Sequence, residues 1–255
     1  MKRQVIAILM LMVLAVPVLC QTAEKKVLVY TKFGKGFVHN CVQACADAVV
    51  EIGKTNGFAV EVSNDPAKFT DENLSQYSVL VFDNTNNEIF DTEAQKKALQ
   101  KYIRSGGGLV GIHSASGGMR KWDWYGKLIG ATFLMHPPVQ PLTITVVDRD
   151  HPSTSFLPET WQWLKDECYF HKDFSKDLRI LLSVKVSTLK PLPGKNFEEL
   201  AKGKSVPMTW CHEFDGGRIW YTALGHAPEH FSDPTFRKHI LGGIQWAMKK
   251  TGDVK

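Results

Sequence analysis

The segment Gly106-Gly-Gly-Leu-Val-Gly-Ile-His-Ser-Ala115 decides the fold of this chain. Three glycines end the preceding segment, and 109–112 is a short apolar run typical of a buried strand. A polar residue, His113, follows at once, where a helix should begin. Such a strand-to-helix turn presents one side chain over a site, as the nucleophile elbow of hydrolases does. The segment therefore predicts an α/β fold with His113 at its functional centre.

Two other interpretations of the same turn stay open. The glycines can simply make a tight turn, with His113 hydrogen-bonded locally. Ser114 is a fallback nucleophile, although the Gly-x-Ser-x-Gly pattern of serine hydrolases is absent.

Strands and helices alternate upstream of this turn. The hydrophobic pattern predicts strands at 26–31, 58–62, 77–82 and 109–112 and helices at 39–55 and 91–105. This alternation favours a parallel sheet covered on both faces. Ligands of such sheets bind beyond the carboxyl ends of the strands. The loops expected there are 33–40, 83–88 and 113–118.

The second half of the chain is less regular. Strands are expected at 142–147, 180–186, 206–214 and 218–223, and the last helix at 234 to about 250. Asp215-Gly-Gly217 is a strong hairpin signal between the last two strands. The Pro- and Gly-containing segment 187–204 is expected to be a surface loop. No repeat or interdomain linker interrupts the pattern, so a single domain is predicted over 21–255.

The N-terminus resembles an export signal. Lys2 and Arg3 precede an apolar run from Val5 to Leu19, and the polar mature sequence begins near Gln21. We expect a signal peptide at 1–20 and a periplasmic or secreted protein, with no membrane span in the mature chain. Lipid anchoring at Cys20 is the less favoured alternative, because Leu19 is bulky for a lipoprotein site.

Charge and cysteines exclude some classes of function. The net charge of +5 includes Lys2 and Arg3, and no basic run remains in the mature chain, so nucleic acid is not an expected partner. Cys41 and Cys45 lie four residues apart on one face of a predicted helix. The favoured interpretation is that they are buried apolar residues, and a disulfide or metal pair is the alternative.

Several motifs in order resemble the ThuA-like, or trehalose-utilisation, family. They are 106–115, Met135-His-Pro137, Asp150-His-Pro152, Asp166-Glu-Cys-Tyr169, Gly216-Gly-Arg-Ile-Trp-Tyr221 and Leu224-Gly-His226. The family's fold is similar to that of the class I glutamine amidotransferases. The resemblance implies a flavodoxin-like three-layer sandwich with a mainly parallel central sheet, and a role in sugar utilisation. In those amidotransferases the elbow carries a cysteine nucleophile, so His113 at this position excludes glutamine hydrolysis.

The histidines and one carboxylate are the candidate catalytic groups. Imidazole exchanges protons near neutral pH and is the commonest metal ligand. We expect His113, Glu167 and His226 to be catalytic. We expect substrate contacts from His39, Asp166, Trp122, Trp124 and Tyr169, because aromatic faces stack on sugar rings. A simpler role for Asp166 is to cap neighbouring N–H groups.

Three kinds of site remain open for these residues. One is a metal-free His/Glu acid–base site. The second is a metal-assisted site, with zinc or manganese held by His39, His113, His136 and His226, although no HxH or HExxH spacing supports it. The third is a carbohydrate-binding pocket or scaffold without catalysis. The preferred function is an exported enzyme that acts on a disaccharide or a modified sugar, for example a keto-sugar. Its partner is a small carbohydrate, and it can form homo-oligomers.

Overall fold

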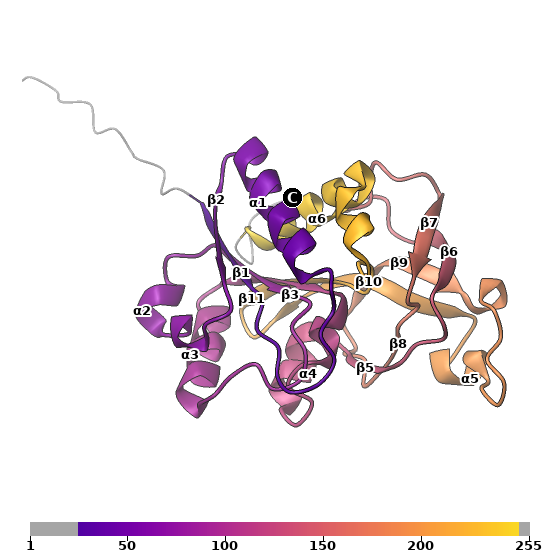
Figure 1. Ribbon diagram of the computed structural model, residues 1–255, viewed down its shortest axis with the longest axis horizontal. Helices are drawn as coiled ribbons and strands as arrows, with labels where there is room; N and C mark the ends of the chain where they lie inside the picture. Colours follow the sequence, from indigo (N-terminus) through magenta and orange to yellow (C-terminus); the bar gives the residue numbers. More distant parts are fainter. Residues whose placement is uncertain (1–24, 250–255) are drawn as a thin grey trace, which may run out of the picture.

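The structure is a computed structural model and describes residues 25–249 (Figure 1). The predicted signal peptide at 1–20 and Cys20 lie outside these residues. A nine-stranded sheet, with strand order β2-β1-β3-β4-β11-β10-β9-β6-β7, forms the centre of the fold. Its first five strands are parallel: β2 (Ala59–Ser63), β1 (Lys26–Tyr30), β3 (Val79–Asp83), β4 (Gly108–Ile112) and β11 (Gly217–Thr222). Their order is that of flavodoxin.

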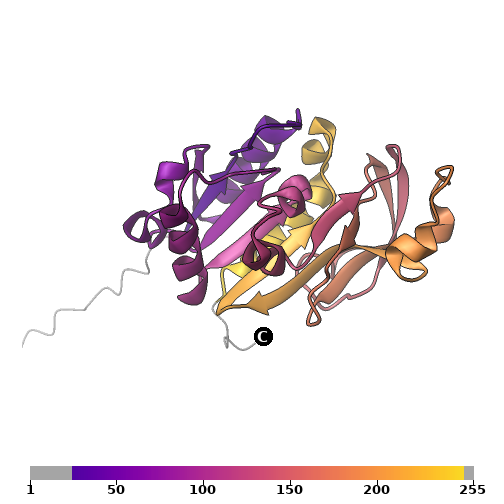
Figure 2. The ribbon, with the colours of Figure 1, turned by 90° about the horizontal axis from the view of Figure 1, so that it is seen from below.

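The other four strands extend the sheet in antiparallel fashion (Figure 2). They are β10 (Ser205–Phe214), β9 (Arg179–Lys185), β6 (Gln140–Val146) and β7 (Thr160–Asp166). A separate antiparallel pair, β5 (Thr132–Met135) and β8 (Phe170–Lys172), lies between the two parts. The two-part sheet brings residues of the extension to the carboxyl edge of the parallel strands.

Helices cover both faces of the parallel strands (Figure 1). One layer holds α1 (Val42–Asn56) and α6 (Pro234–Ala247), and the other holds α2 (Asp71–Leu74), α3 (Glu93–Arg104) and α4 (Asp123–Ile129). Local sequence fixes where α3 begins: the Thr92 side chain accepts from Gln95 N while the Gln95 side chain accepts from Thr92 N. The three-layer α/β sandwich predicted from the sequence is confirmed.

Several sequence predictions need correction. The segment 187–204 is not all loop: η3 (Val186–Thr188) and the short helix α5 (Phe197–Ala201) lie within or next to it. Asn196 caps α5 by accepting from Glu198 N and Glu199 N, and Phe197 is buried. The last helix ends at Ala247, and β5, β7, β8, α2 and α4 were not predicted. The hairpin between β10 and β11 and the four free, buried cysteines, including Cys41 and Cys45, are as expected.

Within residues 25–249, no helix is long and apolar enough to cross a bilayer.

Gly106, which precedes β4, and Gly108, the first residue of β4, have different roles. Gly106 has a φ of +92°, the left-handed conformation that ends α3. Gly108 lies where a Cβ would stand 2.2 Å from Ala247 O, at the end of α6. Because a backbone atom cannot move aside cheaply, Gly108 allows α6 to pack directly on the sheet.

Replacement of Gly108 by alanine is therefore expected to lower the free energy of unfolding by about 1–3 kcal/mol, the usual cost of overpacking. Urea denaturation of the purified protein measures this change. Gly203→Ala is the matched control, because nothing lies within 4 Å of its Cβ position. If both variants unfolded at the same urea concentration as wild type, the close approach of α6 to Gly108 would not constrain the fold.

Candidate functional site

His113 lies at a strained turn at the end of β4. Its φ is +50°, whereas Ile112 before it is extended, and the following turn is the 3-10 helix η2 (His113–Gly117) rather than an α-helix. The Tyr221 hydroxyl donates to His113 O at 2.7 Å and fixes the turn from the neighbouring strand β11. Left-handed backbone at a non-glycine residue is uncommon and concentrates at functional sites. The elbow predicted from the sequence is present, with His113 as the residue that it displays.

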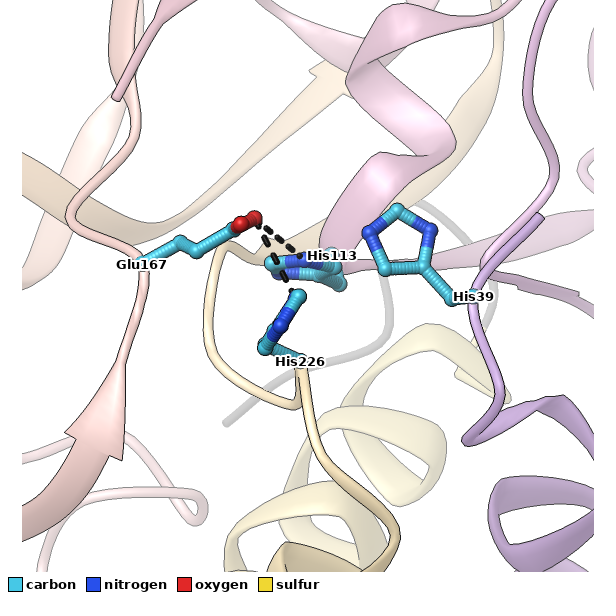
Figure 3. A group of neighbouring side chains, drawn as sticks. All are labelled: His39, His113, Glu167 and His226. Carbon is cyan, nitrogen blue, oxygen red and sulfur yellow. Dashed lines mark ion pairs between the residues drawn. The ribbon is translucent and has the colours of Figure 1, made fainter. Parts of the chain in front are cut away.

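Four side chains converge beside this turn (Figure 3). One candidate ligand atom from each of His39, His113, Glu167 and His226 lies within 4.8 Å of the others. His39 comes from the loop between β1 and α1, and His226 from the loop after β11. Glu167 directly follows β7, so the antiparallel extension supplies the carboxylate. Residues far apart in the sequence thus meet at the carboxyl edge of the sheet, where the sequence places the loops of His39 and His113 but not those of Glu167 and His226.

Glu167 is in contact with three imidazoles. Its Oε2 lies 3.3 Å from His113 Nε2 and 3.3 Å from His226 Nδ1, and its Oε1 lies 3.3 Å from His136 Nε2. His136 is the most open of the three, with 35% of its side chain exposed. It lies next to the four converging residues and faces solvent.

The tautomer of His113 follows from its partners. Its Nδ1 is 2.6 Å from Ala223 O, and a ring nitrogen that faces a carbonyl oxygen must donate. In a neutral ring the lone pair is then on Nε2, which faces Glu167 and lies 2.8 Å from the Tyr169 hydroxyl. A backbone carbonyl that fixes the tautomer in this way is typical of metal-binding histidines.

Burial and mutual contact shift the titration of the cluster. Burial, with the charges of His113 and His226, lowers the pKa of His39 to about 3, so this ring is neutral at pH 7. Burial alone would raise the pKa of Glu167, but contacts with His113 and His226 hold it well below its usual range. The carboxylate of Glu167 in turn raises the pKa of His226. Glu167 is therefore ionised, and at least one neutral imidazole is available as a ligand.

Asp166 holds the backbone on either side of the His/Glu cluster. Its carboxylate is fully buried and accepts from Trp163 Nε1 at 2.8 Å, Glu167 N at 2.7 Å, Gly225 N at 3.0 Å and His226 N at 3.4 Å. It thereby ties the loop that carries Glu167 to the loop that carries His226. This geometry supports the capping interpretation of Asp166 rather than a direct substrate contact.

The two predicted sugar-stacking tryptophans do not lie among the four converging residues. The Trp122 ring stacks on Trp124 with centroids 5.1 Å apart, and Lys96 Nζ lies 5.6 Å over it. Trp124 donates to Asp215 Oδ2 at 2.9 Å. Trp122 does line a cavity of about 440 Å³ next to the elbow. Their role as a carbohydrate platform stays a prediction, with most of their ring surface already occupied by protein.

Two contacts of the site were not predicted. Tyr221 fixes the elbow through its hydroxyl, and Phe37 packs its ring against His39 with centroids 4.8 Å apart. Tyr221 lies in a strand whose sequence is typical of the buried core. That pattern gives no signal that the Tyr221 hydroxyl contacts the elbow. The signal for Phe37 was available: an apolar residue in a glycine-containing loop two positions before a histidine.

The fold and the site together define a flavodoxin-like protein with a His/Glu cluster in place of the amidotransferase cysteine. The family model of ThuA, described as trehalose utilisation, matches residues 26–247, and the chain belongs to this family. A sequence comparison with curated proteins gives no match.

Two solved structures have the same fold. A ThuA-like protein from Bacteroides uniformis ATCC 8492 is 24% identical, with a TM-score of 0.71 over 91% of this chain and 95% of that one. A ThuA-like protein from Parabacteroides merdae ATCC 43184 is 21% identical, with a TM-score of 0.70 over 91% of this chain and 93% of that one.

Proposed function

We propose that this protein is an exported, metal-assisted enzyme that moves protons on a carbohydrate, either a disaccharide or a modified sugar such as a keto-sugar. The convergence of His39, His113, Glu167 and His226 within 4.8 Å carries the proposal. The family's association with trehalose utilisation supports a sugar substrate. The apolar run from Val5 to Leu19 supports export.

The donor set fits a divalent cation such as zinc or manganese. Neutral imidazoles and one carboxylate are the ligands that both ions accept. Ligand atoms of a tetrahedral site with metal–ligand distances near 2.1 Å lie about 3.4 Å apart, so the four side chains would have to draw together by roughly 1 Å to close the observed spread of up to 4.8 Å. His39 Nδ1 is buried and has no hydrogen-bond partner among residues 25–249, an arrangement that a buried polar atom rarely keeps.

The bound ion would act as a Lewis acid on a carbonyl or hydroxyl oxygen of the sugar. His136, next to Glu167 and open to solvent, is placed to exchange protons between the site and water. Burial raises the pKa of the Tyr169 phenol well above its usual value, so Tyr169 stays protonated and can donate a hydrogen bond to the substrate. Tyr169 would thus orient the sugar, while Asp166 would hold the loops that carry Glu167 and His226.

A metal-free acid–base site is the second candidate. Two contacts favour it: His113 Nε2 already lies 2.8 Å from the Tyr169 hydroxyl, and Glu167 Oε2 lies 3.3 Å from His226 Nδ1. In this version His113 and Glu167 exchange protons directly with the sugar.

Deuterium exchange on a keto-disaccharide distinguishes these candidates. In D₂O, NMR should show deuterium entering at the carbon next to the ketone, and elemental analysis should find about one divalent ion per chain. Chelation should stop the exchange, and zinc or manganese should restore it. Exchange that survives chelation in a metal-free protein would establish the second candidate instead. Binding without exchange would indicate a non-catalytic carbohydrate-binding protein.

A further inference from the structure

Phe37 stands exposed at the edge of the candidate metal centre. It is 65% exposed, the most of any large apolar side chain in residues 25–249. Phenylalanine is usually among the buried residues, so a ring that is this open next to a functional cluster needs an explanation. Phe33 and Val38, in the same loop, are 41% and 43% exposed. The three side chains together are called the Phe37 patch below.

Within the patch, Phe37 contacts the site. The Phe37 and His39 rings pack nearly perpendicular to each other, at 81°, with centroids 4.8 Å apart. The His39 ring in turn lies 4.7 Å from that of His113. A ligand held at the His/Glu cluster on the His39 side would therefore extend onto Phe37.

The loop is held in place before any ligand arrives. Gly34 N donates to Asn86 O at 2.8 Å, and Asn86 Nδ2 donates to Phe37 O at 3.4 Å. Phe33 also forms a parallel bridge with Asn86. These contacts fix the loop to the segment after β3. Because the loop is already ordered, little conformational entropy would be lost when a ligand covers the Phe37 ring.

The chemistry of the patch distinguishes a sugar from an apolar group. Sugar hydroxyls lose their hydrogen bonds to water when they are buried, and need polar partners in exchange. The side chains of Phe33, Phe37 and Val38 offer none, whereas the cluster beyond His39 offers several. A ligand with a polar end at the cluster and a flat apolar end on Phe37 satisfies both surfaces.

We propose that the Phe37 patch binds the aromatic aglycone of a glycoside whose sugar occupies the His/Glu cluster. This inference rests on the proposed function for the sugar, and on the patch alone for the aglycone. The inference makes Phe37 a specificity-determining residue. Phe37 would select among glycosides by the aglycone that the sugar carries.

Calorimetry with phenyl β-D-glucopyranoside and methyl β-D-glucopyranoside tests the proposal. Burial of a phenyl ring predicts that wild type binds the phenyl glycoside roughly tenfold more tightly than the methyl glycoside. Phe37→Ala should remove most of that preference and change methyl glucoside binding by less than about twofold, whereas Phe37→Tyr should retain it. Phe174→Ala is the matched control, because Phe174 is 37% exposed and contacts His171 and Trp210 instead.

Several results would overturn the inference. They are equal binding of the two glycosides by wild type, binding of neither, or an equal loss for both in Phe37→Ala. A change of oligomeric state in Phe37→Ala, seen by sedimentation, would indicate that a second copy covers the patch. The titrations are repeated on chelator-treated protein. A Phe37-dependent phenyl preference that survives there supports the patch even if the metal-assisted function fails.

Discussion

Replacement of Glu167 by glutamine is expected to weaken zinc binding by more than about 100-fold, since even partners outside the ligand set cost 10–100-fold. Glu167 is the only carboxylate among the four converging side chains, and its oxygens lie 3.3 Å from three imidazoles. Glutamine keeps the shape but removes the negative charge that offsets the charge of the cation. The proton exchange proposed for the site should fall with the metal.

Competition with a chromophoric chelator measures this loss, and circular dichroism checks that the variant folds. Glu159→Gln is the matched control, because Glu159 is exposed just before β7 and makes no ion pair among the described residues. If Glu167→Gln bound zinc as tightly as Glu159→Gln, the cluster would not be a metal site. Loss of proton exchange with intact zinc binding would make Glu167 an acid–base group.

Replacement of Asp166 by alanine is expected to lower the free energy of unfolding by about 3–5 kcal/mol, the cost of breaking a buried, hydrogen-bonded charge network. The change leaves four donors without their acceptor: Trp163 Nε1 and the backbone N–H groups of residues 167, 225 and 226. Each unsatisfied buried donor costs about 1–3 kcal/mol, partly recovered where water can enter.

Urea denaturation with the metal removed measures this effect without any contribution from binding. Asp47→Ala, an exposed position on α1, should change stability by no more than about 0.5 kcal/mol. A stable Asp166→Ala with unaltered zinc affinity would show that the two loops are held by other contacts. A stable variant with weakened zinc affinity would confine the role of Asp166 to positioning the ligands.

The parallel half of the fold could be predicted from the local hydrophobic pattern, because most strands there are continuous apolar runs within a few residues. Leu109 to Ile112 is fully buried on both faces and reads as an unbroken apolar run. The antiparallel extension was harder to predict. In β7, the buried Trp161 and Trp163 alternate with exposed residues, but Lys165 and Asp166 obscure the end of the pattern.

The candidate site was predictable in its members but not in its geometry. His39, His113 and His226 follow parallel strands, and the carboxyl ends of such strands meet at one edge. Glu167 follows an antiparallel strand, so only its place in a family motif suggested it. Trp122 and Trp124 looked like a sugar platform because the sequence does not show that their rings pack on each other. Phe37 was not singled out, although it lies in the loop 33–40 that the sequence places at this edge of the sheet.

The order of strands in the sheet has a consequence for how the protein becomes active. β11, which precedes His226, lies beside β4 but is made only after the whole antiparallel extension. A chain emerging from the ribosome or from a translocation channel can pair β1, β3 and β4 early, yet it lacks His226, the last of the four converging residues, until β11 has been made. Contacts of such long sequence separation form slowly. The cluster would then form late, so a partly folded chain would lack the complete set of side chains that is proposed to hold a metal ion.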